Sequence, residues 1–410
     1  MSDEAVDVAV VGGGPAGALL AARVAAAGRD VVVLERQPSW VWHACGVFAS
    51  PASVRELRRA GVREPTLDVV ARRIPAMRVE TPAGTVFRLT YGAERVGGEA
   101  PVAFDRSRLD PALIDLALAA GANVRCGATV ERVDALDGGW LVRYRTAGEE
   151  RRLRVPIVVG ADGHRSTVAR ALAVDRPARL GHRVGLTWHV EDEGGDGPQD
   201  GRMVILDGAY CGLAPVPGRR LNVGIVLASP AWHERLAQDG AEAVGAEILR
   251  RIRPAADSPE GWRTGHRLEP IAGASPLGHR VTRRAGPGWL LVGDAAGFLD
   301  PFTGEGLHRA LVSARIGAEA VIAALAAPDP GARDATLARY GAAMRGRFAS
   351  KDLVSYVVQA FLARPALFEY ASSRLARRRR VRETMGLVMG DLVPASRAID
   401  LRYLAALLAP

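Results

Sequence analysis

The sequence predicts an α/β fold, in which an N-terminal strand–helix–strand unit is followed by strand-rich insertions and a helical C-terminal region. Three observations predict it. Residues 6–36 place a β-branched run, a glycine-rich turn, an alanine-rich helical stretch and a second β-branched run in order. Residues 158–172 and 288–311 each carry an apolar run that ends at a Gly/Asp turn before a helical stretch. Residues 73–100 and 176–280 are richer in alternating strands than in helices.

Length and composition place the chain among globular proteins with more than one structural unit. Its 410 residues exceed what one hydrophobic core usually serves. The hydrophobic fraction of 48% and the charged fraction of 24% are ordinary for such proteins. The net charge of +9 comes from arginines spread along the chain, with Lys351 as the single lysine, and no nucleic-acid-binding motif accompanies it. We interpret the charge as a compositional bias and expect no nucleic-acid partner.

The cysteines and the N-terminus indicate the compartment. Cys45, Cys126 and Cys211 lie far apart and form no CxxC pair, which disfavours a disulfide framework and a metal site. The first residues, MSDEAVDVAVV, are acidic where a signal peptide is basic. No uncharged apolar run reaches the length of a membrane span, about 18 residues. The sequence therefore predicts a cytoplasmic protein with no bound metal and no transmembrane segment.

The glycine pattern near the N-terminus is typical of a dinucleotide-binding unit. Gly12 allows a tight turn, Gly14 lets the backbone approach a pyrophosphate, and Gly17 lets the helix pack close to the strand. Glu35 ends the second strand, where a carboxylate can accept a hydrogen bond from a ribose hydroxyl. The motif alone does not separate FAD from NAD. The residues assigned to the cofactor from this unit are Gly12, Gly14, Pro15, Ala16, Gly17, Glu35 and Arg36.

Two later segments separate these cofactors. In VVGADGHRSTVARAL (158–172) a strand precedes Asp162 and Gly163, and in GWLLVGDAAGFLDPFTGEGLHRAL (288–311) a strand precedes Gly293 and Asp294. With the N-terminal glycines, these segments resemble the three signatures of the flavoprotein superfamily that contains the single-component aromatic hydroxylases, the flavin-dependent halogenases and the geranylgeranyl reductases. The resemblance spans at least residues 6–325. It implies FAD as the cofactor, held in a Rossmann-like (GR2-type) domain.

The resemblance also assigns roles around the flavin. It implies that Asp294, beside Gly293, accepts a hydrogen bond from the ribityl part of FAD. It further implies that the next turn leads into a helix whose N-terminus lies over the flavin pyrimidine and stabilises negative charge there. The residues assigned to FAD from this turn are Pro301, Gly304, Gly306 and Leu307.

Further cofactor contacts follow from the same resemblance. Arg106, at the start of a predicted helix, is placed near the pyrophosphate, with Arg108 as the alternative. Val130 is placed beside the adenine. Asp162, Gly163 and Arg165 are expected to support contacts with FAD and with NAD(P)H. Because the sequence shows no second dinucleotide fold, NAD(P)H is expected to bind only transiently.

The domains implied by the resemblance are assembled from separate segments. An FAD-binding domain carries an inserted, mostly antiparallel β-sheet substrate domain with a hairpin around 82–84, and a helical C-terminal region follows. In the helical region the arginine cluster RLARRRRVR (374–382) is typical of a solvated helix face, with binding of an anionic partner or a membrane surface as the alternative. The predicted segments are 1–72, 101–175 and 281–330 for the FAD-binding domain, 73–100 and 176–280 for the substrate domain, and 331–410 for the helical region.

The stretch WVWHACGVFASPAS (40–53) supplies candidate residues beside the flavin. Its Cys45-Gly46 turn and the Ser-Pro pair after it resemble the reductase-like and polyketide-associated branches of the superfamily. Val47 stands where those branches usually have Glu, which argues against a proton relay at this position. Cys45 is favoured as a small residue packed by the isoalloxazine over a nucleophile. The candidate catalytic residues are His43, Cys45 and Tyr210, and Cys45 and Gly46 are also assigned to the cofactor.

The chemistry of the superfamily leaves two readings. Halogenation is disfavoured because the chain has one lysine, in its C-terminal region, and no WxWxIP segment. We expect an FAD-dependent monooxygenase that hydroxylates an aromatic, phenolic or polyketide-derived small molecule through a flavin C4a-hydroperoxide, with molecular oxygen as co-substrate and NAD(P)H as reductant. The alternative is a flavin-dependent ene-reductase or dehydrogenase of the geranylgeranyl-reductase type, which acts on prenyl or polyene substrates in a long apolar pocket.

Overall fold

The centre of the molecule is a six-stranded sheet built from segments far apart in the sequence. The computed structural model describes residues 4–92, 100–179, 181–192, 194, 198–253 and 265–409. Five neighbouring strands of this sheet are parallel, and the edge strand β21 is antiparallel to β22. Across the sheet the order is β21 (Ala285–Gly286), β22 (Trp289–Leu291), β13 (Ile157–Gly160), β2 (Val8–Val11), β3 (Val31–Glu35) and β9 (Asn123–Cys126).

Helices cover one face of this sheet and a second sheet covers the other. Successive side chains of a strand point to opposite faces. Val8 and Val10 of β2 therefore join the core formed with the helices, whereas Ala9 and Val11 join the core formed with the second sheet. The covering helices are α1 (Pro15–Ala26), α5 (Arg106–Ala119) and α8 (Gly306–Leu325). The second sheet has the order β1 (Glu4–Ala5), β12 (Glu149–Val155), β11 (Gly139–Thr146) and β10 (Thr129–Leu136).

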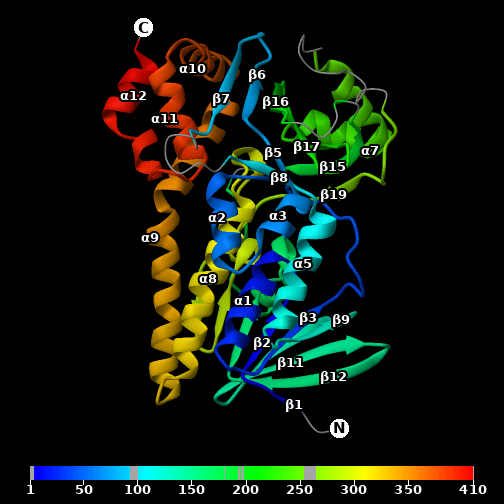
Figure 1. Ribbon diagram of the computed structural model, residues 1–410, viewed down its shortest axis with the longest axis vertical. Coiled ribbons are helices and arrows are strands. Elements are labelled where there is room, and N and C mark those ends of the chain that lie inside the picture. The colour runs from blue at the N-terminus through cyan, green and yellow to red at the C-terminus, as the bar shows by residue number, and fades with distance from the viewer. Residues whose placement is uncertain are drawn as a thin grey trace.

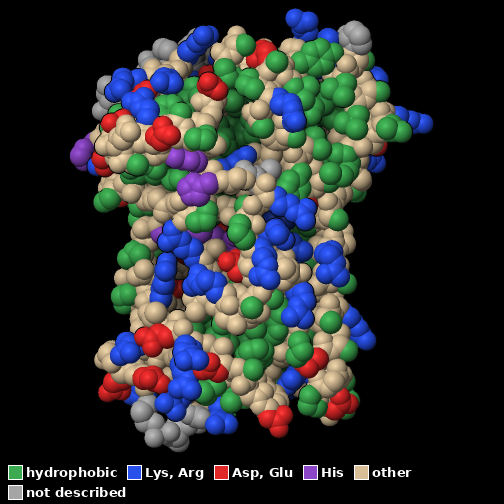
Figure 2. Space-filling model, turned by 180° about the vertical axis from the view of Figure 1, so that it is seen from behind, with side chains coloured by type: hydrophobic (Ala, Val, Ile, Leu, Met, Phe, Trp, Pro, Cys, Tyr) green, Lys and Arg blue, Asp and Glu red, His purple; other side chains and the backbone are tan. Residues whose placement is uncertain are grey.

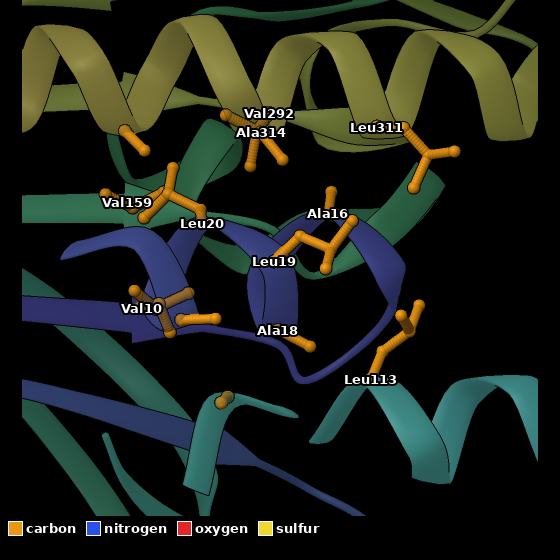
Figure 3. Packing of buried hydrophobic residues seen from close by; sticks show 14 of the residues in the cluster. Val10, Ala16, Ala18, Leu19, Leu20, Leu113, Val159, Val292, Leu311 and Ala314 are labelled. Atoms are coloured by element: carbon orange, nitrogen blue, oxygen red, sulfur yellow. The ribbon is translucent and has the colours of Figure 1, made fainter. Parts of the chain in front are cut away.

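The contact between α1 and α8 holds together two segments that each begin at a glycine-rich turn. Leu19 and Leu20 of α1 lie in one buried cluster with Leu311 and Ala314 of α8 (Figure 3). Gly317 of α8 has no room for a side chain, because a Cβ there would lie 3.0 Å from Val292 and 3.2 Å from Leu20. Close packing of α1 and α8 thus fixes the loops at their N-termini relative to each other.

A seven-stranded, mostly antiparallel sheet lies above the central sheet in Figure 1. Both strand-rich insertions contribute to it, and the predicted hairpin around 82–84 is confirmed by the pairing of β6 with β7. The domain limits themselves stay a prediction. Across the sheet the order is β19 (Ala272–Ala274), β15 (Val184–Glu191), β18 (Arg220–Leu227), β17 (Ala209–Val216), β16 (Gly201–Leu206), β6 (Ala76–Glu80) and β7 (Val86–Thr90).

One long helix of the insertion was not predicted. Helix α7 (Pro230–Arg251) buries Trp232, Val244 and Ile248 against the seven-stranded sheet. Gly240 inside it has a φ of +82°, so the helix is interrupted there. Because the break divides the apolar spacing into two short runs, the sequence pattern does not predict a helix of this length.

Shorter elements connect the large sheets. A three-stranded sheet has the order β4 (Phe48–Ala49), β8 (Val102–Phe104) and β5 (Ala71–Arg73), and a two-stranded sheet pairs β14 (Asp175–Pro177) with β20 (His279–Val281). Three short helices are α2 (Pro51–Arg59), α3 (Glu64–Val70) and α6 (Thr167–Ala171). The 3-10 turns include η1 (Gly163–Arg165), η3 (Gly293–Ala296), η4 (Pro301–Thr303) and η5 (Ala395–Ala398).

The C-terminal region is helical, as predicted. Helix α9 (Pro330–Leu362) runs beside α8 and carries the chain from the lower end of the molecule to the upper end (Figure 1). Helices α10 (Pro365–Arg377) and α11 (Arg379–Met389) then pack against β7, and α12 (Leu401–Leu408) packs on α10 and α11. Within the described ranges, none of the helices is long and apolar enough to span a bilayer.

Candidate functional site

A large cavity connects the central sheet with the C-terminal helices. Its volume is about 1180 Å³, and its walls run from the glycine-rich turn after β2, along the seven-stranded sheet, to α9–α12. All predicted cofactor and catalytic residues except Gly17 line it. They are Gly12, Gly14, Pro15, Ala16, Glu35, Arg36, His43, Cys45, Gly46, Arg106, Val130, Asp162, Gly163, Tyr210, Gly293, Asp294, Pro301, Gly304, Gly306 and Leu307.

The glycine-rich turn has the geometry of a ligand cradle. Gly12 has a φ of +103°, and a Cβ there would lie 2.5 Å from the carbonyl oxygen of Ala161. Gly14 has no atom within 4 Å of the position of a Cβ, so space for a ligand lies beside its backbone. Gly17 serves packing, since a Cβ there would lie 2.0 Å from the carbonyl oxygen of Gly12. The N-terminus of α1, which follows this turn and lines the cavity, suits a pyrophosphate.

Glu35 is fixed at the end of β3 by two backbone donors. Its carboxylate accepts hydrogen bonds from Gly13 N at 2.8 Å and from Gln37 N at 2.9 Å. The side chain lines the cavity, and a carboxylate has acceptor capacity beyond these two bonds. Its position therefore fits a hydroxyl of a ribose.

Asp294 is a partly buried carboxyl group in the cavity wall, and its pKa is raised. It follows β22 in the turn η3, and no donor in the described part of the chain bonds its carboxylate. Burial raises the pKa of this carboxyl to about 6, although Arg106 and Arg309 oppose the shift. A carboxylate in this environment is stabilised by a ligand hydroxyl that donates to it. The site thus fits the ribityl chain of a flavin.

Arg106, and not Arg108, reaches the interior of the site. Its guanidinium donates to both carboxylate oxygens of Asp110, at 2.7 and 2.8 Å, and to the carbonyl oxygen of Gly46 at 2.9 Å. Arg108 is exposed and lies 3.5 Å from Asp105. Arg106 therefore holds the Cys45-Gly46 turn against α5 while also lining the cavity.

The thiol of Cys45 is not activated. Burial raises its pKa to about 11, and the positive charge of Arg106 offsets that rise only in part. The thiolate is the nucleophilic form of cysteine. At neutral pH Cys45 is therefore a small, protonated side chain in the cavity wall, which agrees with the interpretation favoured from the sequence.

Asp162 caps a helix and leaves one oxygen free. Its Oδ2 accepts a hydrogen bond from Thr167 N at 2.6 Å, at the start of α6. Its Oδ1 is buried and has no partner in the described residues. Burial raises the pKa of this carboxyl, and the hydrogen bond from Ser166 and those from the backbone oppose the shift. Gly163 begins the turn η1 beside it, and both residues line the cavity, so their contact with a cofactor stays a prediction.

Tyr210 belongs to a buried polar network that the sequence did not reveal. Its hydroxyl donates to Asp300 Oδ1 at 2.7 Å, and Gln359 Nε2 donates to the same oxygen at 2.7 Å. Arg183 forms an ion pair with Asp300. Burial, and then Asp300, raise the pKa of Tyr210 far above its usual value, so its proton is held. The network joins three segments: strand β17, helix α9, and the loop that precedes α8. These segments are far apart in the sequence, so no local sequence pattern predicts that they meet.

Two histidines, His43 and His189, lie near the Cys45-Gly46 turn or the tryptophan beside it, and their surroundings differ. His43 lines the cavity, is exposed and bonds through Nδ1 to the carbonyl oxygen of Val41 at 2.9 Å. His189 lies under Trp42 and bonds through Nδ1 to Glu269 at 2.5 Å. Of these two residues, only His43 is a cavity-wall residue, which keeps it among the candidate catalytic side chains.

The end of the cavity far from the glycine-rich turn is apolar. Four of the six methionines line the cavity, and thioether side chains adapt their shape to flexible apolar ligands. Residues from the four C-terminal helices form much of this wall, and sequence reasoning assigned none of them to the site. They are Val354, Val357, Val358, Phe361, Phe368, Ala371, Ser372, Leu375, Met385, Met389, Tyr403, Leu404 and Leu407, with Ala398 and Ile399 beside them.

Comparison of the sequence with known proteins identifies a protein family and several similar reductases. The model of the FAD binding domain family matches residues 5–345. Digeranylgeranylglycerophospholipid reductase 2 of Methanopyrus kandleri is 31% identical over 338 residues, which cover 80% of this chain and 79% of that protein. Menaquinone reductase of Mycolicibacterium smegmatis is 32% identical over 337 residues, which cover 76% of this chain and 75% of that protein.

A solved structure shares the fold over the whole chain. The crystal structure of a geranylgeranyl bacteriochlorophyll reductase-like protein from Thermoplasma acidophilum matches with a TM-score of 0.78 and 22% identity. The match covers 100% of this chain and 96% of that chain. At this identity the likeness shows the fold, including the helical C-terminal region.

Proposed function

Because the chain belongs to the FAD binding domain family and is an FAD-dependent oxidoreductase, we propose that it is a reductase that saturates carbon–carbon double bonds in a long isoprenoid chain. The proposal takes up the alternative reading of the sequence. The relatives that share about a third of their residues with this chain are reductases named for an isoprenoid phospholipid and for a menaquinone. Hydroxylation of an aromatic ring rests on motifs that all branches of the superfamily share, so it has less support.

The observation that carries this proposal is the continuous cavity. One end is a dinucleotide cradle with Asp294 and Glu35 in its wall, and the other is an apolar chamber formed by β6, β7 and α9–α12. A long flexible hydrocarbon gains free energy from such a chamber at roughly 0.8 kcal/mol for each buried CH₂ group. A compact phenol would leave much of the chamber empty.

The residues of the cradle hold the cofactor and position its reactive ring. We propose that Glu35 accepts from the ribose, Asp294 accepts from the ribityl chain, and the N-terminus of α8 favours negative charge at the flavin pyrimidine. When bound, reduced FAD would supply a hydride to one carbon of the double bond, the other carbon would take a proton that comes from water, and we propose NAD(P)H as the reductant class. Tyr210 is bonded to Asp300 and holds the loop before α8 in place.

The test is a reduction assay with product analysis. The FAD-loaded protein is reduced without oxygen by dithionite, NADH or NADPH in separate reactions and mixed with a geranylgeranyl lipid in detergent. We expect the flavin to reoxidise and the lipid to gain two hydrogen atoms for each saturated bond, as measured by mass spectrometry. A phenol or polyketide that gains one oxygen atom in air, with no change in the lipid, would instead support the monooxygenase reading.

A further inference from the structure

The last fifty residues concentrate positive charge at one end of the molecule. Residues 361–410 contain nine arginines and four acidic residues, a net charge of +5 out of the +9 of the whole chain. These residues form α10, α11, η5 and α12, at the end of the long axis opposite the N-terminus (Figure 1). In Figure 2 this part of the surface, at the upper right, shows apolar and basic side chains with few acidic ones.

The acidic residues of this end are engaged within the fold. Glu383 pairs with Arg379 at 2.8 Å, and Asp391 pairs with the buried Lys351 at 2.9 Å. Asp400 caps α12 by accepting from Tyr403 N at 2.7 Å. Four exposed arginines have no carboxylate partner among the described residues. They are Arg377, Arg380, Arg397 and Arg402, and together with α10–α12 we call them the basic cap.

Helix α12 carries apolar side chains on both of its faces. Leu404 and Leu407 point into the wall of the cavity. On the outer face Leu401 is 85% exposed and Leu408 is 43% exposed. Arg402 is also exposed on this helix, so its outer side combines two exposed leucines with a basic residue. Exposed leucines of this kind indicate a contact with an apolar phase. The helix is held in place at its end, where the hydroxyl of Tyr370 donates to the carbonyl oxygen of Leu408 at 2.8 Å.

We propose that the basic cap docks on an anionic lipid bilayer, with Leu401 and Leu408 inserted among the acyl chains and the four arginines paired with lipid phosphates. The proposal rests on the proposed function, because an isoprenoid lipid lies in a membrane. The outer and inner faces of α12 are separated by one helix diameter, about 10 Å. A chain that leaves the bilayer at the cap therefore travels a short distance to the apolar end of the cavity.

The physical chemistry of the cap suits a bilayer better than a protein partner. Leu401 and Leu408 share the short helix α12 with Arg402, and Arg377, Arg380 and Arg397 lie on the neighbouring elements α10, α11 and η5. Exposed apolar side chains combined with arginines in this way are typical of a surface that binds at the membrane interface. Each arginine near an anionic surface strengthens binding about fivefold, the equivalent of about 1 kcal/mol. Because salt screens such charges, binding should weaken as ionic strength rises.

The test measures binding of the FAD-loaded protein to vesicles by co-sedimentation. We expect binding to vesicles that contain phosphatidylglycerol, and little binding to vesicles of phosphatidylcholine alone. Leu401→Asp and the quadruple change of Arg377, Arg380, Arg397 and Arg402 to Gln should each reduce binding at least tenfold. Matched controls are Leu118→Asp, at a position 48% exposed on α5, and Arg63→Gln with Arg339→Gln, which should bind as the parent does.

The outcomes separate this proposal from the proposed function. Cap variants should still reduce a detergent-solubilised geranylgeranyl lipid, since none of the changed residues lines the cavity. Absence of vesicle binding by the parent, or equal binding by cap and control variants, would overturn docking even if the reductase assay succeeds. Vesicle binding without lipid reduction would overturn the proposed function and leave docking intact. A dimer that Leu401→Asp dissociates, without vesicle binding, would assign this face to a second copy of the chain.

Discussion

At the scale of single residues, Asp294 shows how burial prepares a side chain for a ligand. Burial raises its pKa to about 6, compared with about 3.9 for an ordinary aspartate. The folded apoprotein therefore binds this proton more tightly than the unfolded chain does. The stability contributed by the protonated form is present in full below about pH 4 and is lost as pH rises through about 6. Burial makes the charged carboxylate of Asp294 unfavourable in the apoprotein. A cofactor hydroxyl that donates a hydrogen bond to this carboxylate offsets the unfavourable free energy, because it stabilises the charged form.

We expect Asp294→Asn to flatten this pH dependence. Between pH 5 and pH 8 the parent apoprotein should lose about 1–2 kcal/mol more of its free energy of unfolding than the variant does. Urea unfolding of both proteins at the two pH values measures the difference, and the comparison cancels the titration of all other groups. FAD should also bind the parent more tightly at pH 8 than at pH 5. Parallel pH profiles of the two proteins would show that Asp294 is not the group responsible.

Cys45 provides a second prediction at this scale. With a pKa raised to about 11 by burial, its thiolate fraction at pH 8 is about a hundredfold or more below that of an unperturbed thiol. Iodoacetamide should therefore modify the exposed Cys126 well before Cys45. Peptide mass spectrometry over time gives the two rates. Faster modification of Cys45 would restore it as a candidate nucleophile.

At the scale of elements, the turn before α8 decides where the helix N-terminus lies. Gly304 has a φ of +66°, and a Cβ there would lie 2.5 Å from Phe48. Gly306 has no such restriction, since the nearest atom to a Cβ is on Phe298 at 3.5 Å. The two glycines of one short turn therefore have different physical roles, although the sequence presents them alike.

This difference predicts opposite outcomes for two similar variants. Gly304→Ala should destabilise the protein by about 1–2 kcal/mol from its left-handed backbone alone, with a further cost for displacing Phe48. Gly306→Ala should leave stability unchanged or raise it by up to about 1 kcal/mol, because alanine favours the first turn of α8. Thermal unfolding with and without FAD measures both effects. Equal losses in the two variants would contradict the assigned backbone roles.

At the scale of the whole molecule, the cavity is built by segments that meet only in the fold. The cradle comes from the N-terminal half and the segment before α8, while the apolar chamber comes from an inserted sheet and the last four helices. The long helix α9 links them, and the single lysine, Lys351, fixes it by bonding the carbonyl oxygen of Val388 at 2.7 Å and Asp391 at 2.9 Å. The length of ligand that fits is therefore a property of the whole assembly.

Shortening the chamber should shorten the accepted substrate. Val358 lines the cavity on α9, and Val358→Trp should lower the reduction of a twenty-carbon isoprenoid relative to a ten-carbon one by at least about tenfold. FAD affinity should not change, because the cradle lies at the other end. Leu353→Trp is the matched control, since Leu353 is on the same helix but 50% exposed and outside the cavity wall. Equal chain-length preference in both variants would place the substrate elsewhere.

The sequence by itself identified residues that line one end of the cavity, and their roles toward FAD stay a prediction. Gly12, Glu35 and Asp294 lie at strand ends within short local motifs, and backbone geometry at such turns depends on nearby residues, so local pattern suffices. The hairpin around 82–84 and the helical C-terminal region were predicted for the same reason.

Only the tertiary structure decided the substrate end. The partnership of Tyr210 with Asp300 and Gln359, and the apolar wall formed by α9–α12, join residues up to hundreds of positions apart. An apolar residue on a helix has the same pattern whether it faces a solid core or a cavity. That distinction depends on what packs opposite it, which is why the sequence left hydroxylation and double-bond reduction as competing readings.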